Sequence, residues 1–186
     1  DRKYYLYCKK ETCDNMAKRI VTKMGDIFCV EIDNGYKRFF QYIINDIEAL
    51  NSSVIRVFKT HYPMDYRPII EEIVMDEVEF YAHTVLRAGI VYGAWYKVGN
   101  SKEIGEGHKD VLFGTASDVR VLPNKELEFV SPSENWYVWH INEPPLFVGK
   151  LTEKYKDLEQ GDVMSYVSII DRLRNGRYMR KCQGNG

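Results

Sequence analysis

Apolar and polar residues alternate along much of this chain, with the two-residue period that is typical of β-strands. The clearest such segments are 27–32 and 36–44, which are separated by an Asp-Asn-Gly turn at 33–35. Asn-Gly between two apolar segments is typical of a β-hairpin, because both central positions of a type I′ turn need a positive φ. Residues 53–60 alternate in the same way. The pattern therefore predicts three sequential antiparallel strands.

Two other segments have the 3.6-residue spacing of helices. One begins at Pro68, a residue that suits the first turn of a helix, and keeps its apolar spacing to Met75. The other is 162–174, and Gly176 follows it at the place where a left-handed C-terminal cap is expected. Alternation returns at 77–86, although one long helix running from Pro68 through this segment also fits the spacing.

The remaining apolar segments predict further strands. They are 89–98, 111–113, 119–122, 127–130, 136–142 and 146–151. Trp136 and Trp139 face opposite sides of their strand, so we expect one face to pack in the core and the other to meet the C-terminal helix or a partner. The chain is therefore predicted to be a mainly β (α+β) protein. We expect a single antiparallel β domain, barrel- or sandwich-like, with one short central helix and a C-terminal helix.

The length of 186 residues is typical of one domain. Periodicity is weak at the N-terminus, so we expect a loosely ordered arm over 1–23, the mainly β domain over 24–180 and a tail over 181–186. No apolar segment reaches the roughly 18–20 residues of a membrane span. The N-terminus also lacks the apolar core of a secretory signal. We therefore expect a cytoplasmic protein with no membrane partner.

The formal net charge of −1 conceals an uneven distribution. Residues 1–24 contain seven basic and three acidic side chains, and the segment from Arg172 onward contains five basic side chains and no acidic one. The intervening segment, 25–171, therefore has a net charge of −10. Such an acidic body repels nucleic-acid phosphates and attracts basic proteins, although it is also an ordinary charge for solubility. The basic residues from Arg172 onward suit the dipole at a helix C-terminus and need no nucleic-acid partner to explain them. Together with the acidic body, this leads us to expect that nucleic acid is not the partner.

Residues that could perform chemistry are scattered rather than arranged in motifs. Cys8 and Cys13 have the spacing of zinc ligands, but no second close pair follows, and a disulfide between them is an open alternative. Cys29 lies in an apolar strand, where burial raises the pKa of a thiol and makes it a poor nucleophile. The histidines are isolated, and there is no phosphate-binding loop or nucleophile elbow. We therefore expect no metal site, no cofactor and no enzyme activity. The alternative is an enzyme site assembled from distant residues, such as His61 or His108 with a carboxylate.

Four motifs occur in order along the chain. They are Met-Gly-Asp-Ile-Phe at 24–28, Gly-Ala-Trp-Tyr-Lys-Val-Gly-Asn at 93–100, Trp-Tyr-Val-Trp at 136–139 and Arg-Leu-Arg-Asn-Gly-Arg-Tyr at 172–178. Their order and spacing resemble the immunity protein 26 family of bacterial proteins encoded beside polymorphic toxins. One departure is the absence of a glycine-rich stretch at 36–40. The residues that we expect to form the shared structural framework are Gly25, Asp26, Trp95, Gly99, Trp136, Trp139, Gly149, Arg172, Gly176 and Tyr178.

The resemblance implies a mainly β protein that protects the producing cell in interbacterial competition by stoichiometric binding of a cognate protein toxin. Nuclease toxins are often basic around the substrate cleft, so an acidic inhibitor gains association rate by electrostatic steering. We expect exposed tyrosines to serve as anchors beside five acidic residues: Glu71, Glu72, Asp76, Glu77 and Glu79. The alternatives are an ordinary solvated helix face, and an accessory domain that binds peptide or carbohydrate through its aromatic residues.

Overall fold

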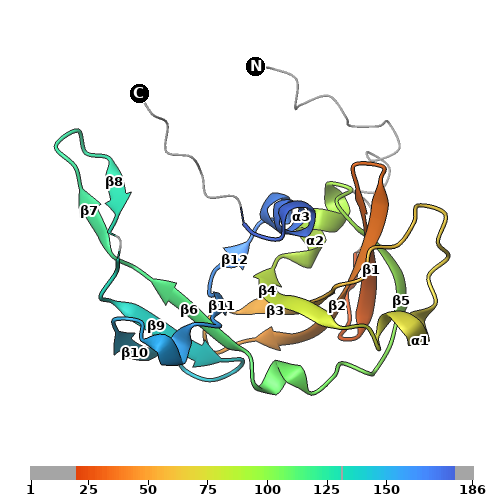
Figure 1. Ribbon diagram of the computed structural model, residues 1–186, viewed down its shortest axis with the longest axis horizontal. Helices are drawn as coiled ribbons and strands as arrows, with labels where there is room; N and C mark the ends of the chain where they lie inside the picture. The colour runs from red at the N-terminus through yellow and green to blue at the C-terminus, as the bar shows by residue number, and fades with distance from the viewer. Residues whose placement is uncertain (1–19, 131, 179–186) are drawn as a thin grey trace.

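The computed structural model describes residues 20–130 and 132–178, and Figure 1 shows them arranged around two β-sheets that lie side by side. The strands of the first sheet are β1 Asp26–Ile32, β2 Tyr36–Asp46, β3 Ser52–Phe58, β4 Val78–Thr84, β5 Tyr96–Asn100 and β12 Val163–Met164. The second sheet contains β6 Leu112–Ala116, β9 Trp136–His140, β10 Leu146–Gly149 and β11 Glu159–Gln160. A separate hairpin of β7 Val119–Val121 and β8 Leu127–Phe129 projects beyond the second sheet.

The strand order is β12-β4-β3-β2-β1-β5 in the first sheet and β10-β9-β6-β11 in the second. Most neighbouring strands are antiparallel, whereas β12 pairs with β4 and β11 pairs with β6 in parallel. The prediction of a mainly β, α+β protein is therefore confirmed. Within the described residues the outer strands β12 and β5 do not pair with each other, so the first sheet is open and is not a closed barrel.

The β1–β2 hairpin forms as the sequence predicts, with a turn one residue earlier than expected. Asp33 and Asn34, rather than Asn34 and Gly35, adopt positive φ angles of 49° and 56°. The amide of Gly35 donates to the carbonyl of Ile32 at 2.8 Å and closes the turn. Asp and Asn tolerate this left-handed region because their short side chains can bond locally to the backbone.

The α-helices of the described chain are α1 Ile70–Ile73, α2 Leu86–Val91 and α3 Tyr166–Asn175, with 3₁₀ turns η3 at Gly107–Lys109 and η4 at Glu153–Tyr155. None of them is long and apolar enough to cross a membrane. The short helix α1 confirms the helix predicted after Pro68. The strand predicted over 89–98 is wrong in its first part, which belongs to α2. A Cβ atom on Gly89 would lie 2.0 Å from Cε2 of Trp95, so the indole packs directly on the backbone of α2.

The C-terminal helix begins later than the sequence predicts. Val163, expected in the helix, lies in β12 and pairs with His83 of β4. Ser165 then caps α3, because its hydroxyl accepts from the amide of Ser168 at 3.1 Å. Gly176 ends the helix with a φ of 70°, as predicted for the left-handed cap.

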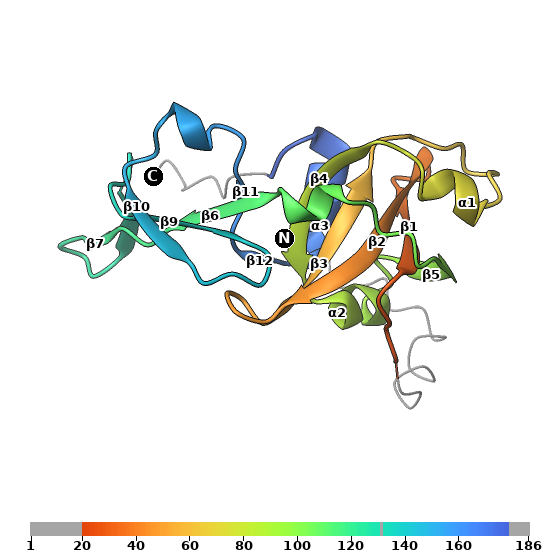
Figure 2. The same cartoon turned by 90° about the horizontal axis from the view of Figure 1, so that it is seen from below.

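Three apolar clusters hold the elements together. One lies between the first sheet and the helices α2 and α3, which Figure 1 shows together over one face of the sheet. A second packs α1 against the opposite face and contains Cys29, which is fully buried as predicted. The third joins the two sheets through Ile43 and Val54 of the first and Phe113 and Trp139 of the second. Figure 2 shows the sheets adjoining along the strands β4, β6 and β11. The burial of each such side chain contributes about 1.5–3 kcal/mol.

Candidate functional site

The five acidic residues expected at the binding surface lie on α1 and on the chain that leads into β4. Glu71 and Glu72 are exposed on α1, and Glu72 accepts a hydrogen bond of 3.4 Å from the hydroxyl of Tyr66. Among the described residues, Glu71 and Glu72 have no ion pair. Their charges therefore remain available to solvent or to a partner.

Asp76 and Glu77 bind residues that follow β3. The carboxylate of Asp76 accepts from both the amide and the hydroxyl of Thr60, each at 2.9 Å. Glu77 forms an exposed ion pair of 2.9 Å with Lys59, and this hydrogen bond raises the pKa of the lysine. Exposed ion pairs of this kind contribute little to stability. The pairing offsets the charge of Glu77 in the isolated protein.

Glu79 has an internal role because it is the counterion of Arg38. The Arg38 side chain is buried and pairs with Glu79 on the neighbouring part of the sheet. Its guanidinium also donates to the carbonyls of Phe58 at 2.7 Å and Leu173 at 3.3 Å. A buried guanidinium is costly unless it is paired and hydrogen-bonded. Glu79 therefore stabilises the fold, whatever else it contacts.

The expected framework residues of the first sheet gather at the edge formed by β1 and β5. Asp26 is buried, accepts from Asn100 Nδ2 at 2.8 Å and pairs with Lys97 at 2.6 Å. Gly25 precedes it with a φ of 89°. Gly99 lies against Ile70 of α1. These contacts connect the start of the sheet to α1.

The other expected framework residues lie against α2, in the second sheet or in and after α3. Trp95 donates its indole N–H to Leu86 at 3.0 Å, and Trp139 donates its own to Asp46 at 2.9 Å. Trp136 is half-buried on β9, and Gly149 ends β10 with a φ of 69°. Arg172 pairs with Glu159 at 2.8 Å and lies 3.8 Å from the ring centre of Phe80 and 4.8 Å from that of Tyr178.

Neither histidine considered for catalysis, His61 or His108, forms an ion pair or hydrogen bond with a carboxylate of the described residues. Nε2 of His61 accepts from Arg38 at 2.9 Å, because a guanidinium can only donate, and its ring stacks on Tyr36. Nδ1 of His108 donates to the carbonyl of Gly105 at 2.7 Å. No group of three or more His, Cys, Asp or Glu side chains that could hold a metal occurs in 20–130 and 132–178. Cys8 and Cys13 lie outside these described residues.

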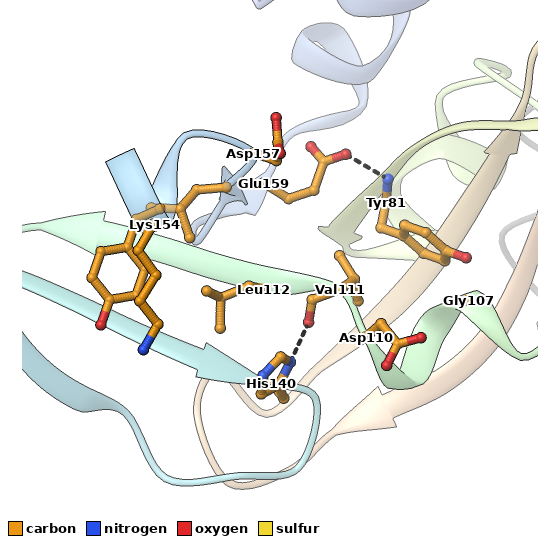
Figure 3. A pocket seen from close by; sticks show the side chains of 11 residues that line it. Tyr81, Gly107, Asp110, Val111, Leu112, His140, Lys154, Asp157 and Glu159 are labelled. Carbon is orange, nitrogen blue, oxygen red and sulfur yellow. Dashed lines mark hydrogen bonds between the residues drawn. The ribbon is translucent and has the colours of Figure 1, made fainter. Parts of the chain in front are cut away.

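A cavity of about 450 Å³ lies between β4 and the second sheet (Figure 3), and the sequence analysis did not identify it. Its polar and aromatic lining comes from four separate parts of the chain: Tyr81 on β4, Asp110 after η3, His140 on β9, and Lys154, Tyr155, Asp157 and Glu159 on and after η4. Gly107 lies close beside it, since a Cβ atom there would lie 2.8 Å from the hydroxyl of Tyr81. No local sequence pattern links such distant residues.

Two hydrogen bonds fix the polar groups of this cavity. Figure 3 shows Glu159 accepting from the amide of Tyr81 at 3.1 Å and His140 donating through Nδ1 to the carbonyl of Val111 at 2.9 Å. Burial raises the pKa of the Tyr81 hydroxyl, and the carboxylates of Glu159 and Asp110 act in the same direction against the opposing effect of Arg56. The phenol therefore stays protonated and can donate a hydrogen bond, whereas the ionised carboxylates of Asp110, Asp157 and Glu159 can only accept.

Comparison with protein families gives one match. A family model described as Immunity protein 26 matches residues 23–120, more than half of the 186 residues. The motifs at 24–28 and 93–100 lie within this match, and the motifs at 136–139 and 172–178 lie outside it. Comparisons with curated proteins and with solved structures found no match.

Proposed function

Because this chain belongs to the immunity protein 26 family, we propose that it neutralises a cognate bacterial toxin by stoichiometric binding. The family match is the observation that carries this proposal. Binding would protect the producing cell by occupying the toxin's active site or a neighbouring surface, without turnover of a substrate. We place the complex in the cytoplasm of the protected cell.

The proposed contact surface is the acidic region around α1, facing a basic site on the toxin. Glu71 and Glu72 support it because both are exposed and neither has an ion pair among the described residues. Asp76 and Glu77 extend the region toward β4, and Glu79 contributes its charge while holding Arg38. Tyr66, beside Glu72, is the nearest tyrosine that could act as an anchor. Opposite surface charges accelerate association through long-range attraction.

The test of function is expression of this protein together with the toxin encoded beside its gene. We expect restored growth of the toxin-producing strain and a one-to-one complex by calorimetry. Continued killing with no complex formation would overturn the proposal. Protection that requires turnover, with far less protein than toxin, would indicate an enzyme instead.

The test of the surface is the double variant Glu71→Lys with Glu72→Lys, compared with Glu48→Lys with Glu143→Lys. Both pairs make the same change in net charge at exposed positions, but the control pair lies by the loops next to Asp46. We expect the α1 variant to associate roughly tenfold more slowly at low salt, with the difference shrinking above 0.5 M salt, where charges are strongly screened. Equal association rates for the two variants would reject the α1 surface.

A further inference from the structure

The cavity between β4 and the second sheet has a hydrogen-bonding character that identifies the kind of group it can hold. Its histidine carries a hydrogen on Nδ1. A carbonyl oxygen can only accept, so the 2.9 Å bond between His140 Nδ1 and Val111 places the hydrogen on Nδ1. In the neutral ring, Nε2 then offers a lone pair. The half-buried imidazole therefore presents an acceptor at the cavity wall.

The carboxylates of the cavity differ in whether they already have hydrogen-bond or ion-pair partners. Both oxygens of Glu159 are engaged, one by the amide of Tyr81 at 3.1 Å and the other by Arg172 at 2.8 Å. Asp110 and Asp157 are exposed and have no ion pair among the described residues. Figure 3 shows Asp110 and Lys154 on opposite sides of the cavity. Two free carboxylates therefore remain in the lining.

Among the described residues that line the cavity, Lys154 is the cationic side chain, and it contacts another lining residue. The ammonium of Lys154 lies 5.3 Å from the ring centre of its neighbour Tyr155, in a cation–π contact. Lys154 is exposed like Asp110 and Asp157, so its charge offsets one of these two carboxylates and one negative charge remains. With two free carboxylates, a histidine acceptor and tyrosine rings, the lining favours a cation that donates hydrogen bonds and accepts none.

We propose that this cavity binds the guanidinium of an arginine side chain presented by the toxin. A guanidinium has five N–H donors in a plane, no acceptor, and a flat face that stacks on aromatic rings. The cavity of about 450 Å³ has room for one such side chain with water. This inference rests on the proposed function, and it adds a specific anchor to the acidic surface around α1.

The cavity combines residues from the family match with residues beyond it. Tyr81 and Asp110 lie within the segment that matches the family, whereas His140, Lys154 and Asp157 lie beyond residue 120. The binding groups are therefore divided between the shared part of the chain and the part outside the family match.

The direct test uses N-acetyl-arginine N-methylamide as the probe and the citrulline analogue as its neutral, nearly isosteric control. Both are titrated into the full-length protein while the NMR signals of His140, Tyr81 and Leu112 are followed. We expect saturable shifts for the arginine probe with a dissociation constant on the order of 1 mM, as for other small ligands of this size. The citrulline probe should bind at least tenfold more weakly. Equal binding of both probes, or no shift at these residues, would overturn the proposal.

Variants at exposed positions test the assigned groups without disturbing the core. Asp110→Asn with Asp157→Asn should weaken binding of the arginine probe at least fivefold, and Lys154→Gln should strengthen it by removing a like charge. The control Glu48→Gln removes an exposed carboxylate outside the cavity and should change nothing. Unchanged binding by the double variant would show that the probe binds elsewhere, which also rejects the site.

The toxin complex separates this inference from the proposed function. If the wild-type protein binds the toxin and the Asp110→Asn, Asp157→Asn variant dissociates at least tenfold faster, the anchor is supported. If that variant binds the toxin like the wild type, the function stands and the toxin arginine is rejected. If the wild-type protein does not bind the toxin, the proposed function fails, and with it the arginine's assignment to the toxin.

Discussion

The imidazole of His83 and the carboxylate of Asp46 form a buried pair in which Nε2 lies 2.9 Å from Oδ2. The same oxygen accepts from the indole N–H of Trp139 at 2.9 Å, and the other oxygen accepts from the amides of Ala49 and Asn142. One carboxylate at the end of β2 thus joins both sheets. Nδ1 of His83 is buried and has no hydrogen-bond partner among the described residues.

Stability should depend on pH through His83. Burial lowers the pKa of this histidine, although its bond to Asp46 acts in the opposite direction. As pH falls below about 6.5, the unfolded histidine gains a proton and the folded one does not, so the free energy of unfolding decreases. The contribution is at most about 1.4 kcal/mol per pH unit. Urea denaturation at pH 5, 6 and 7 should show that the free energy of unfolding depends less steeply on pH for His83→Gln than for the wild type. The same pH dependence for both proteins would contradict this.

Removal of the carboxylate at position 79 should be far more costly than its removal at position 71. Glu79→Gln leaves the buried guanidinium of Arg38 without its counterion, and we expect a loss of roughly 1.5–3 kcal/mol in the free energy of unfolding. Glu71→Gln changes an exposed helix position and should stay within about 0.5 kcal/mol of the wild type. Both losses can be measured from the denaturant midpoints, provided that the slope of the unfolding free energy against denaturant concentration is unchanged. Similar losses for the two variants would mean that Arg38 does not depend on Glu79.

A methyl group at position 89 should disrupt the packing of Trp95. The Cβ atom of Gly89→Ala would fall 2.0 Å from the indole, which is bordered by Phe40 and fixed by its bond to Leu86. Overpacking of this kind costs about 1–3 kcal/mol. Thermal unfolding should show the loss, and near-ultraviolet circular dichroism should show a changed indole environment. Wild-type values for both measurements would reject the close packing of Trp95 on α2.

The cap of α3 provides a test of backbone conformation alone. Gly176 has a φ of 70°, and a Cβ atom there would meet no atom within 4 Å. Gly176→Ala should therefore destabilise the protein by about 1–2 kcal/mol through the left-handed conformation, without any steric clash. Gly176→Asn should recover part of this loss, because Asn tolerates that region better. Equal stability of the Ala and Asn variants would point to a different cause.

The sequence predicts the structure best where the deciding interactions are local. The β1–β2 hairpin follows from its turn residues, and the cap at Gly176 follows from the end of an apolar period. The helix α2 is missed because its residues also suit a strand, and the deciding contact is the packing of Trp95 on Gly89. Strands of two residues, such as β12, are too short to show an alternation of apolar and polar residues.

In the candidate sites, too, local features can be predicted from the sequence and contacts between distant residues cannot. The exposure of Glu71 and Glu72 follows from the polar face of a helix, which the sequence shows directly. The pairing of Glu79 with Arg38 joins residues 41 positions apart, and no local pattern indicates it. The arginine-binding cavity is still less accessible to prediction, because η4 and the end of β9 meet Tyr81 only in the folded chain.

The pairing of β12 with β4 has a consequence for the order in which the protein can fold during synthesis. The strands β1 to β5 leave the ribosome before β12 and α3, yet their sheet receives β12 at its edge and α3 over its apolar face. Until residues 163–175 emerge, the face that contains Phe28 and Phe40 lacks its cover from Ile169 and Leu173. A nascent chain therefore exposes an apolar surface that is prone to aggregation, and protection by chaperones should matter most before residues 163–175 have emerged.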